Sequence, residues 1–274
     1  QVNLNTQLWQ CWVCGAKGRK IYQLFRKLKA SKKFFEKLNK YTGDTEYKSS
    51  NKKYDDVKLP NEYKRLINVE KNNPEYRNAL HYLRSRNITK EDILKYDIGY
   101  CESGPYTKMV IIPSYDIDGE LNFFTGRSYY KESSFKHKNP QVSKDIIGFE
   151  LFVNWDEPII LCEGVFDAIA FKRNAIPLFG KTIMNNLKMK IIEKKVKTIY
   201  LGLDTDALKE SIEISEYFIN NGIDVKMMTF NEKDPSETGF ENLLYLIDKT
   251  QTTKFSDLMR LKLNGTKRHM EILR

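Results

Sequence analysis

Two short apolar runs, each followed at once by acidic residues, constrain the fold of this chain more than any other feature. The runs are Ile159–Cys162, before Glu163, and Ile199–Leu203, before Asp204 and Asp206. Short runs that are apolar on both faces and bounded by turn residues are typical of strands buried inside a parallel sheet. The carboxyl ends of such strands open onto one crevice, so we expect these acids to lie close together.

The acidic residues themselves predict a metal site. Asp204 and Asp206 are two positions apart, so in extended backbone they share one face. Together with Glu163 they would repel one another unless a cation neutralised them, which favours Mg²⁺ or Mn²⁺. The alternative is that they are ordinary surface acids at strand ends.

A third strand and a third acidic segment follow the same pattern. The sequence predicts a helix over Ala207–Asn220 and a strand over Val225–Phe230, which leads into an acidic loop containing Asp234. The helix offers a possible apolar stripe made of Leu208, Ile212, Tyr217 and Ile219.

The ordered set of acidic motifs resembles the TOPRIM domain of bacterial and phage DnaG-type DNA primases. The matching segments are Leu161–Ala168, Leu203–Ala207 and Lys233–Glu237. Upstream segments look like the start of the family's RNA-polymerase core, its basic N-terminal subdomain and its substrate-side loop: 82–89, 98–100, 111–113, 118–119, 125–127 and 136–140. The resemblance covers most of residues 76–248.

The resemblance implies an α/β fold, with a TOPRIM parallel sheet flanked by helices. A mixed α+β basic subdomain and a partial zinc ribbon are expected to precede it. The expected divisions are a truncated zinc ribbon plus helix (1–40), a linker (41–73), the basic subdomain (74–155), the TOPRIM domain (156–249) and a basic tail or linker (250–274).

The implied activity is that of a DNA primase core, which makes short RNA primers by metal-dependent nucleotidyl transfer during DNA replication. The implied partners are single-stranded DNA, ribonucleoside triphosphates and a replicative helicase, in the cytoplasm of a bacterium or a phage-infected host. A TOPRIM nuclease, a topoisomerase-like protein and a non-catalytic nucleic-acid-binding module are the alternatives. The upstream motifs favour a primase, either free-standing or derived from a primase–helicase fusion.

The resemblance also assigns roles to individual residues. It implies that Asp204, Asp206 and Asp234 bind Mg²⁺ or Mn²⁺, and that Glu163 is a general base or a further ligand. Asp167 is expected to orient the site without binding the metal. The family usually has an aspartate where this chain has Ser236, which leaves the number of metal ions open. The expected nucleotide or DNA contacts are Lys108, Arg127, Lys136, Lys138, Asn139 and Lys233.

A pair of cysteines near the start of the chain predicts part of a zinc site. Cys11 and Cys14 have the spacing of one zinc knuckle, and segment 9–18 is similar to the second half of the primase zinc ribbon. Tetrahedral zinc needs four ligands, so we expect the first ligand pair upstream of Gln1, and weak order or weak zinc binding in residues 1–20. A redox dithiol or two free thiols are the alternatives.

Composition agrees with this interpretation. The net charge of +10 favours a polyanionic partner, and apolar runs of five or six residues are too short to span a membrane. Four cysteines without a disulfide-like framework fit a reducing compartment.

One further motif is incomplete. Gly180-Lys181-Thr182 resembles the end of a phosphate-binding P-loop, but Ala175 stands where the first glycine of that loop is required.

Local signals predict the remaining elements. Helices are expected over Ile21–Leu38 and from Pro74 to about Arg86, and another is expected after the capping pair Thr89 and Asp92. A hairpin is expected at Asp118-Gly119.

Overall fold

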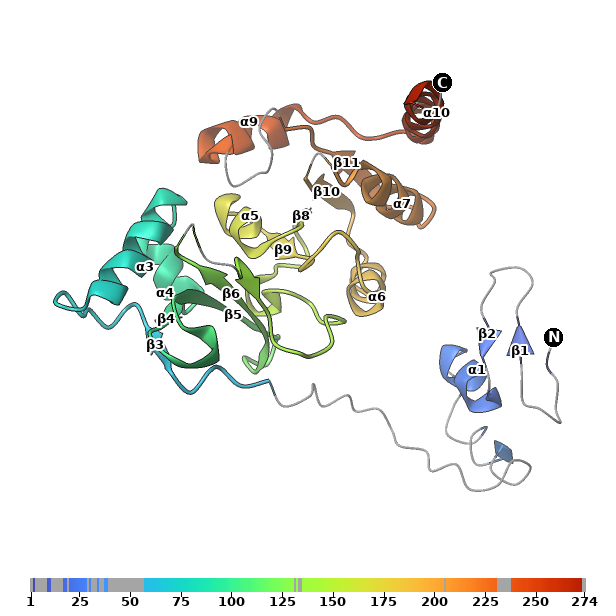
Figure 1. Cartoon of the computed structure of the whole chain (residues 1–274). Helices are drawn as coiled ribbons and strands as arrows, with labels where there is room; N and C mark the ends of the chain where they lie inside the picture. Colours follow the sequence, from blue (N-terminus) through green and yellow to red (C-terminus); the bar gives the residue numbers. More distant parts are fainter. Residues whose placement is uncertain are drawn as a thin grey trace. The chain divides into compact units, whose positions relative to one another are not determined.

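The structure is a computed structural model that describes residues 2, 9–10, 17–18, 20–28, 30, 34, 37–38, 57–130, 132, 135–204, 206–230 and 238–272. The chain forms two compact units, Gln1–Lys53 and Tyr54–Arg274 (Figure 1). The boundary between them lies in the segment 41–73 that the sequence predicts as a linker.

The first unit contains a short antiparallel pair, β1 (Trp9–Gln10) and β2 (Lys17–Gly18). The buried Trp9 indole donates a hydrogen bond to the carbonyl oxygen of Lys20 at 3.0 Å. A Cβ at Gly18 would lie 2.5 Å from the Trp9 Nε1, so glycine is needed where the indole crosses the strand. The pair flanks Cys11 and Cys14, which lie outside the described residues, so the zinc site stays a prediction.

Helix α1 (Ile21–Lys27) is shorter than the predicted helix over Ile21–Leu38. The chain leaves the helix at Leu28, whose side chain is 68% exposed and therefore cannot extend the apolar stripe. Phe34, Lys37 and Leu38 are again helical, so the predicted helix is interrupted after Lys27.

The second unit begins with a five-stranded antiparallel sheet of order β3-β4-β5-β6-β7. The hairpin between β5 and β6 turns at Gly119, as predicted, where a φ of 81° favours glycine. The strands are β3 (Tyr63–Arg65), β4 (Gly99–Cys101), β5 (Met109–Tyr115), β6 (Leu121–Ser128) and β7 (His137–Lys138).

Strand β3 corrects the predicted linker 41–73. It pairs with β4, and the ring of Tyr63 lies over Gly99, where a Cβ would come within 2.2 Å of Tyr63 Cε2. The polar sequence of β3 lacks the apolar pattern by which a strand is predicted. An edge strand can pack through a single apolar contact while its charged side chains remain in water.

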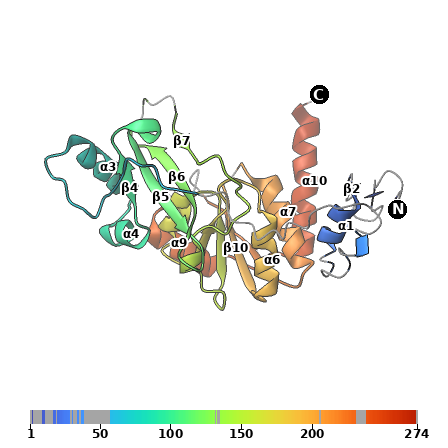
Figure 2. The ribbon, with the colours of Figure 1, turned by 90° about the horizontal axis from the view of Figure 1, so that it is seen from below.

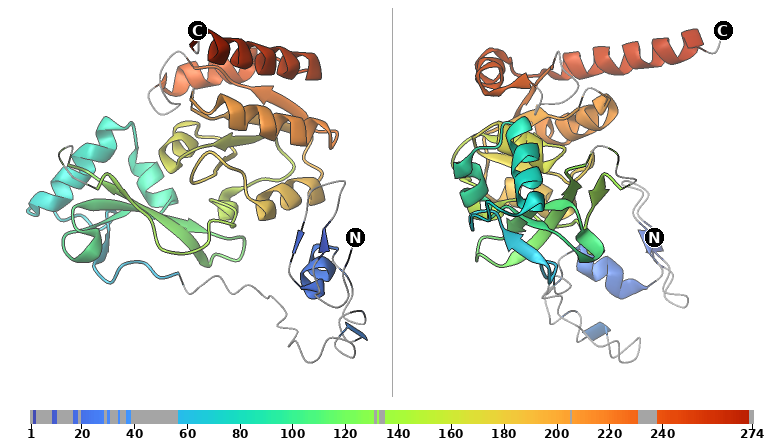
Figure 3. Two further views of the ribbon diagram at one scale, coloured as in Figure 1. Left: turned by 45° about the vertical axis from the view of Figure 1, so that its right-hand side comes forward. Right: turned by 60° about the vertical axis from the view of Figure 1, so that its left-hand side comes forward.

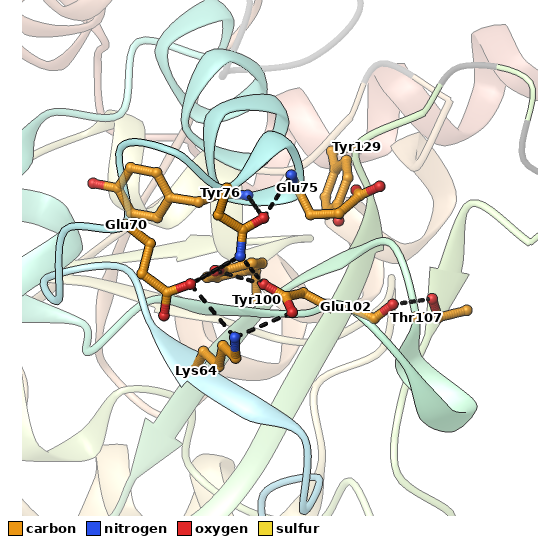
Figure 4. A network of polar contacts seen from close by, with 9 residues as sticks. Lys64, Glu70, Glu75, Tyr76, Tyr100, Glu102, Thr107 and Tyr129 are labelled. Atoms are coloured by element: carbon orange, nitrogen blue, oxygen red, sulfur yellow. Dashed lines mark hydrogen bonds and ion pairs between the residues drawn. The ribbon is translucent and has the colours of Figure 1, made fainter.

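Helices α3 (Pro74–Ser85) and α4 (Lys90–Lys95) begin where the sequence predicts and lie against the antiparallel sheet (Figure 1). Figure 4 shows how the start of α3 is held to the sheet. The Asn73 side chain caps the helix through the Glu75 amide at 2.9 Å and also contacts Tyr100 and Glu102 of the β4 segment. This network fixes the position of α3, which contributes residues to the site below.

The parallel sheet has the order β11-β10-β8-β9, and both of its faces are buried. Ile160 and Tyr200 pack on one face with α5 and α9, whereas Ile159 and Leu201 pack on the other with α6 and α7 (Figure 2). The strands are β8 (Ile159–Cys162), β9 (Ala175–Pro177), β10 (Thr198–Gly202) and β11 (Asp224–Met227), and the helices are α5 (Val165–Ala170), α6 (Asn185–Glu193), α7 (Leu208–Ile219) and α9 (Phe240–Lys249).

The predicted parallel strands and the crossover helix are confirmed, with two corrections. Strand β11 ends at Met227, three residues earlier than predicted. In α7 the buried apolar residues are Ile212, Ile214 and Phe218, while Leu208 is 42% exposed because it stands at the first turn, beyond the edge of the sheet.

The segment after residue 250, expected to be a basic tail or linker, is helical over most of its length. It forms α10 (Phe255–Ile272), which lies beside α7 (Figure 3). Before that helix, the Thr253 amide donates to the Val225 carbonyl at 2.7 Å, and the Thr253 hydroxyl accepts from the Met227 amide at 3.1 Å. These bonds cover the outer edge of β11.

The subdomains expected at 74–155 and 156–249 share one hydrophobic core within the second unit. None of the helices in the described part of the chain combines the length and apolar character required to cross a membrane.

Candidate active site

Glu163 stands at the carboxyl end of β8, immediately before α5. The Gly164 amide at the start of that helix donates to Asp167 Oδ2 at 3.1 Å, and the Asp167 side chain is buried. Asp167 therefore fixes the backbone directly after Glu163, which agrees with the supporting role expected of it.

The predicted convergence of the acidic residues is confirmed. One carboxylate oxygen each from Glu163, Asp204 and Asp206 can be chosen so that all lie within 4.8 Å of one another. They meet because β8 and β10 are adjacent and parallel, so both strands end at the same edge of the sheet. Asp234 and Lys233 lie outside the described residues, so their place in the site stays a prediction.

The electrostatics of the acidic cluster suit a cation. Burial, followed by the negative charge of Asp204, raises the pKa of Glu163, while Lys181 opposes this shift. Glu163 Oε2 is buried and accepts no hydrogen bond from any described residue. A divalent cation would satisfy that oxygen and remove the repulsion, so the carboxylates are suited to hold a metal ion.

The structure adds a cation that the sequence interpretation missed. Lys181 Nζ lies 2.8 Å from Asp206 Oδ2, and this partner raises the pKa of the lysine. Lys181 follows β9 in a loop whose Gly180 amide donates to the Glu163 carbonyl at 3.2 Å. Its position just beyond a strand of the parallel sheet is the signal that could have revealed it, although the local sequence resembles only an incomplete P-loop.

A cleft of about 390 Å³ opens beside the acidic cluster and has two chemically different walls. One wall, here called the acidic wall, carries Glu163, Asp167 and Asp204 from the parallel sheet. The other wall, here called the basic wall, comes from the end of α3, from β6 and from the β7 segment, and is made of Arg86, Thr125, Arg127, His137 and Asn139. The cleft thus brings the positively charged side chains of the basic wall close to the carboxylate cluster that can hold a metal ion.

The basic wall includes two residues that were expected to contact nucleotide or DNA, Arg127 and Asn139, and three that were not assigned, Arg86, Thr125 and His137. Arg86 was not named as a site residue, and its guanidinium lies 5.6 Å from the ring centre of Phe166. Its motif in segment 82–89 was the available signal.

Arg127 and His137 are in direct contact across β6 and β7, which pair at these residues. Desolvation by the surrounding wall, followed by the charge of Arg127, lowers the pKa of His137. The lowered pKa favours the neutral form of the imidazole in the free protein, although His137 is exposed.

A second hollow of about 470 Å³ continues from the basic wall, because Arg86 and Arg127 line both. It is aromatic and basic, as expected for a surface that binds a nucleic-acid strand. Its other lining residues are His81, Tyr82, Ser85, Ser128, Tyr129, Tyr130 and Lys136.

Lys136 thus lies where a nucleic-acid contact was expected, whereas two other lysines do not line either hollow among the described residues. Lys108 lies over the Tyr130 ring, 5.3 Å from its centre. Lys138 donates to the Pro105 carbonyl at 2.6 Å.

Two bacterial proteins of similar sequence each match 61% of the chain. The uncharacterized protein MG010 of Mycoplasma genitalium is 32% identical over 178 residues, which are 61% of this chain and 79% of that protein. Its Mycoplasma pneumoniae homologue is 25% identical, over 61% of this chain and 84% of that protein. No protein-family model matches the sequence.

Solved structures with the same fold are primases. The zinc-binding and RNA polymerase domains of the Aquifex aeolicus primase match with a TM-score of 0.54 and 21% identity, covering 92% of this chain and 75% of that one. A DnaG primase catalytic domain bound to single-stranded DNA matches with a TM-score of 0.59 and 16% identity, covering 74% and 78%. The Escherichia coli primase catalytic core matches with a TM-score of 0.55 and 15% identity, covering 71% and 78%.

The Mycoplasma genitalium protein is matched over 79% of its own length at 32% identity, and the primase structures are matched over at least 71% of this chain. The chain therefore belongs to the family of the Mycoplasma protein MG010, and its fold is that of the DnaG-type primase catalytic core.

Proposed function

We propose that this chain is the catalytic core of a DNA primase, which joins ribonucleotides on a single-stranded DNA template. The observation that carries the proposal is the cleft in which a cluster of carboxylates faces a basic wall. Nucleotidyl transfer needs both, because a metal-holding group must lie beside cations that bind phosphates. The likeness to primase cores supports the same reaction class.

Glu163, Asp204 and Asp206, together with Asp234, are the residues that would hold Mg²⁺ or Mn²⁺. Such an ion, when bound, stabilises the charge that develops on the phosphoryl oxygens and makes a 3′-hydroxyl easier to deprotonate. The choice of magnesium or manganese is part of the proposal.

Glu163 is suited to move a proton as well as to bind a metal. Its raised pKa brings it closer to neutral pH, where a carboxylate is a more effective general base. In this role a carboxylate oxygen of Glu163 that does not bind the metal would accept the proton of the attacking hydroxyl. Asp167 positions Glu163 through the Gly164 amide and touches no reacting atom.

The basic wall is proposed to bind the triphosphate and the template. Arg86 and Arg127 can each donate several hydrogen bonds to phosphate oxygens, and Asn139 can donate to a sugar or base. Lys136 and Tyr130 would continue the template path along the second hollow, where the exposed ring can stack on a base. Lys108, Lys138 and Lys233 would contribute longer-range attraction to phosphate.

Three further assignments complete the proposal. Cys11 and Cys14 supply two ligands to a structural zinc ion, and the other ligands lie elsewhere. The primase acts in the cytoplasm with a replicative helicase. Total zinc measured on the full-length protein would contradict the first assignment if it stayed unchanged in a Cys11→Ser, Cys14→Ser double variant.

The function is tested by incorporation of labelled ribonucleotides on single-stranded DNA, with and without Mg²⁺. Products that require template, metal and all complementary nucleotides are expected, and the Asp204→Asn protein should make none. Cleavage or relaxation of supercoiled DNA, without primer synthesis, would instead favour a TOPRIM nuclease or topoisomerase.

A further inference from the structure

Lys181 occupies an unusual position for a surface lysine, because it reaches the same cluster that is suited to a metal ion. Its ammonium lies 2.8 Å from Asp206 Oδ2. Asp206 in turn belongs to the same cluster of carboxylates as Glu163 and Asp204. Glu163 and Glu210 also attract it electrostatically.

The loop that carries Lys181 is held in place by the site itself. Phe179 and Gly180 both have positive φ, 55° and 151°, and the Gly180 amide is bonded to the Glu163 carbonyl. Gly180 also lines the cleft, so the lysine leaves the backbone at the mouth of the cleft. Its long side chain can therefore reach either the carboxylates or a ligand in the cleft.

The ion pair between Lys181 and Asp206 is exposed to solvent and therefore contributes little to the stability of the fold. The Asp206 side chain is 73% exposed and that of Lys181 is 35% exposed, and solvent screens pairs of this kind. A metal ion bound by the same carboxylates would neutralise Asp206 and remove most of the attraction on the lysine. The nearest new source of negative charge would then be the triphosphate of a nucleotide in the cleft.

We propose that Lys181 is a resident counter-ion of the acidic cluster that competes with the metal ion and, once displaced, binds the triphosphate of the incoming nucleotide. The first half concerns the acidic cluster alone. The second half rests on the proposed function, because it requires a nucleoside triphosphate as the ligand.

The first test is the affinity of the purified protein for Mn²⁺ without nucleotide, measured from the electron paramagnetic resonance signal of free Mn²⁺. Lys181→Met keeps the length of the side chain and removes its charge, so Mn²⁺ should bind roughly three- to tenfold more tightly. Lys194→Met is the matched control, because this exposed lysine at the far end of α6 carries the same charge. Equal Mn²⁺ affinity in wild type and Lys181→Met would overturn the proposal that Lys181 competes with the metal ion for the acidic cluster.

The second test is binding of a fluorescent GTP analogue at saturating Mg²⁺, measured by anisotropy. Lys181→Met should weaken binding about tenfold, Lys181→Arg should restore most of it, and Lys194→Met should match wild type. Unchanged nucleotide affinity in Lys181→Met would overturn the proposal that Lys181 binds the triphosphate once the metal has displaced it.

The two tests separate this inference from the proposed function. Wild-type protein that binds Mn²⁺ but no nucleotide would contradict the primase assignment and the second half of the inference, while the competition would stand on the Mn²⁺ result. Matching melting curves for all variants would exclude misfolding as the cause of any difference.

Discussion

The two walls of the cleft are built in different ways. The acidic wall comes from residues at the ends of adjacent parallel strands, so a few local sequence motifs determine it. The basic wall is assembled from the end of α3, β6 and the β7 segment, so its residues follow no single repeated pattern. The metal-binding residues therefore follow a strand-then-acid pattern that recurs in the sequence, whereas phosphate recognition depends on how the antiparallel sheet and α3 pack.

The strongest test of the acidic wall is Asp204→Asn. This nearly isosteric change removes a metal-binding charge, so primer synthesis should fall by at least about a hundredfold. Without metal, the melting temperature should hold or rise, because one repulsive carboxylate is gone. Calorimetry on the same preparation provides the control, and retained synthesis would remove Asp204 from the site.

A second change separates positioning from metal binding on the same wall. Asp167→Ala removes the acceptor of the Gly164 amide, so Glu163 should be held less firmly. We expect metal affinity to fall by about tenfold, with a loss of stability on the order of 1 kcal/mol. Asp167→Asn should recover part of both, because an amide oxygen can still cap the helix. Unchanged Mn²⁺ affinity in the alanine variant would show that Asp167 only stabilises α5.

The basic wall should respond differently. Arg127→Ala should weaken single-stranded DNA binding by roughly five- to tenfold for all sequences alike, and should lower the salt dependence by about one phosphate contact. Arg173→Ala is a suitable control, because this exposed arginine lines a different hollow. Fluorescence anisotropy over a salt series measures both effects, and a strong preference among template trinucleotides would contradict non-specific phosphate binding.

The smallest expected effect is a pH dependence of DNA binding. The pKa of His137 is lowered in the free protein, and a bound phosphate would raise it again. The complex then binds more protons than the free protein, so affinity should rise as pH falls from 8 to 6, by about two- to threefold. His137→Gln should flatten this profile, whereas an unchanged profile would place the responsible group elsewhere.

The contrast between the walls also explains what could be predicted from the sequence. Glu163, Asp204 and the strands before them were predicted correctly, because apolar runs and strand-end acids are local signals. Arg86 and Lys181 were missed, since their roles depend on which elements lie side by side. Lys181 becomes part of the site only because β9 pairs with β8. No sequence pattern around residue 181 predicts that pairing.

The remaining corrections have a similar cause. Strand β3 is a short polar edge strand, recognisable only through the contact between Tyr63 and Gly99. Helix α10 has a basic sequence that resembles a tail, and its packing depends on α7, to which Lys262 is joined by an ion pair with Glu216 at 2.8 Å. Periodicity within one segment cannot reveal a partner that lies elsewhere in the chain.

The hydrogen bonds of Thr253 with β11 bear on how this protein can be shortened. They occupy main-chain groups of Val225 and Met227 that would otherwise face outward from the last strand of the sheet. An open strand edge of this kind invites pairing with other chains. A protein ending near residue 249, where the TOPRIM domain was expected to stop, would keep every catalytic carboxylate and yet be prone to aggregate, so expression boundaries should include residue 253 and α10.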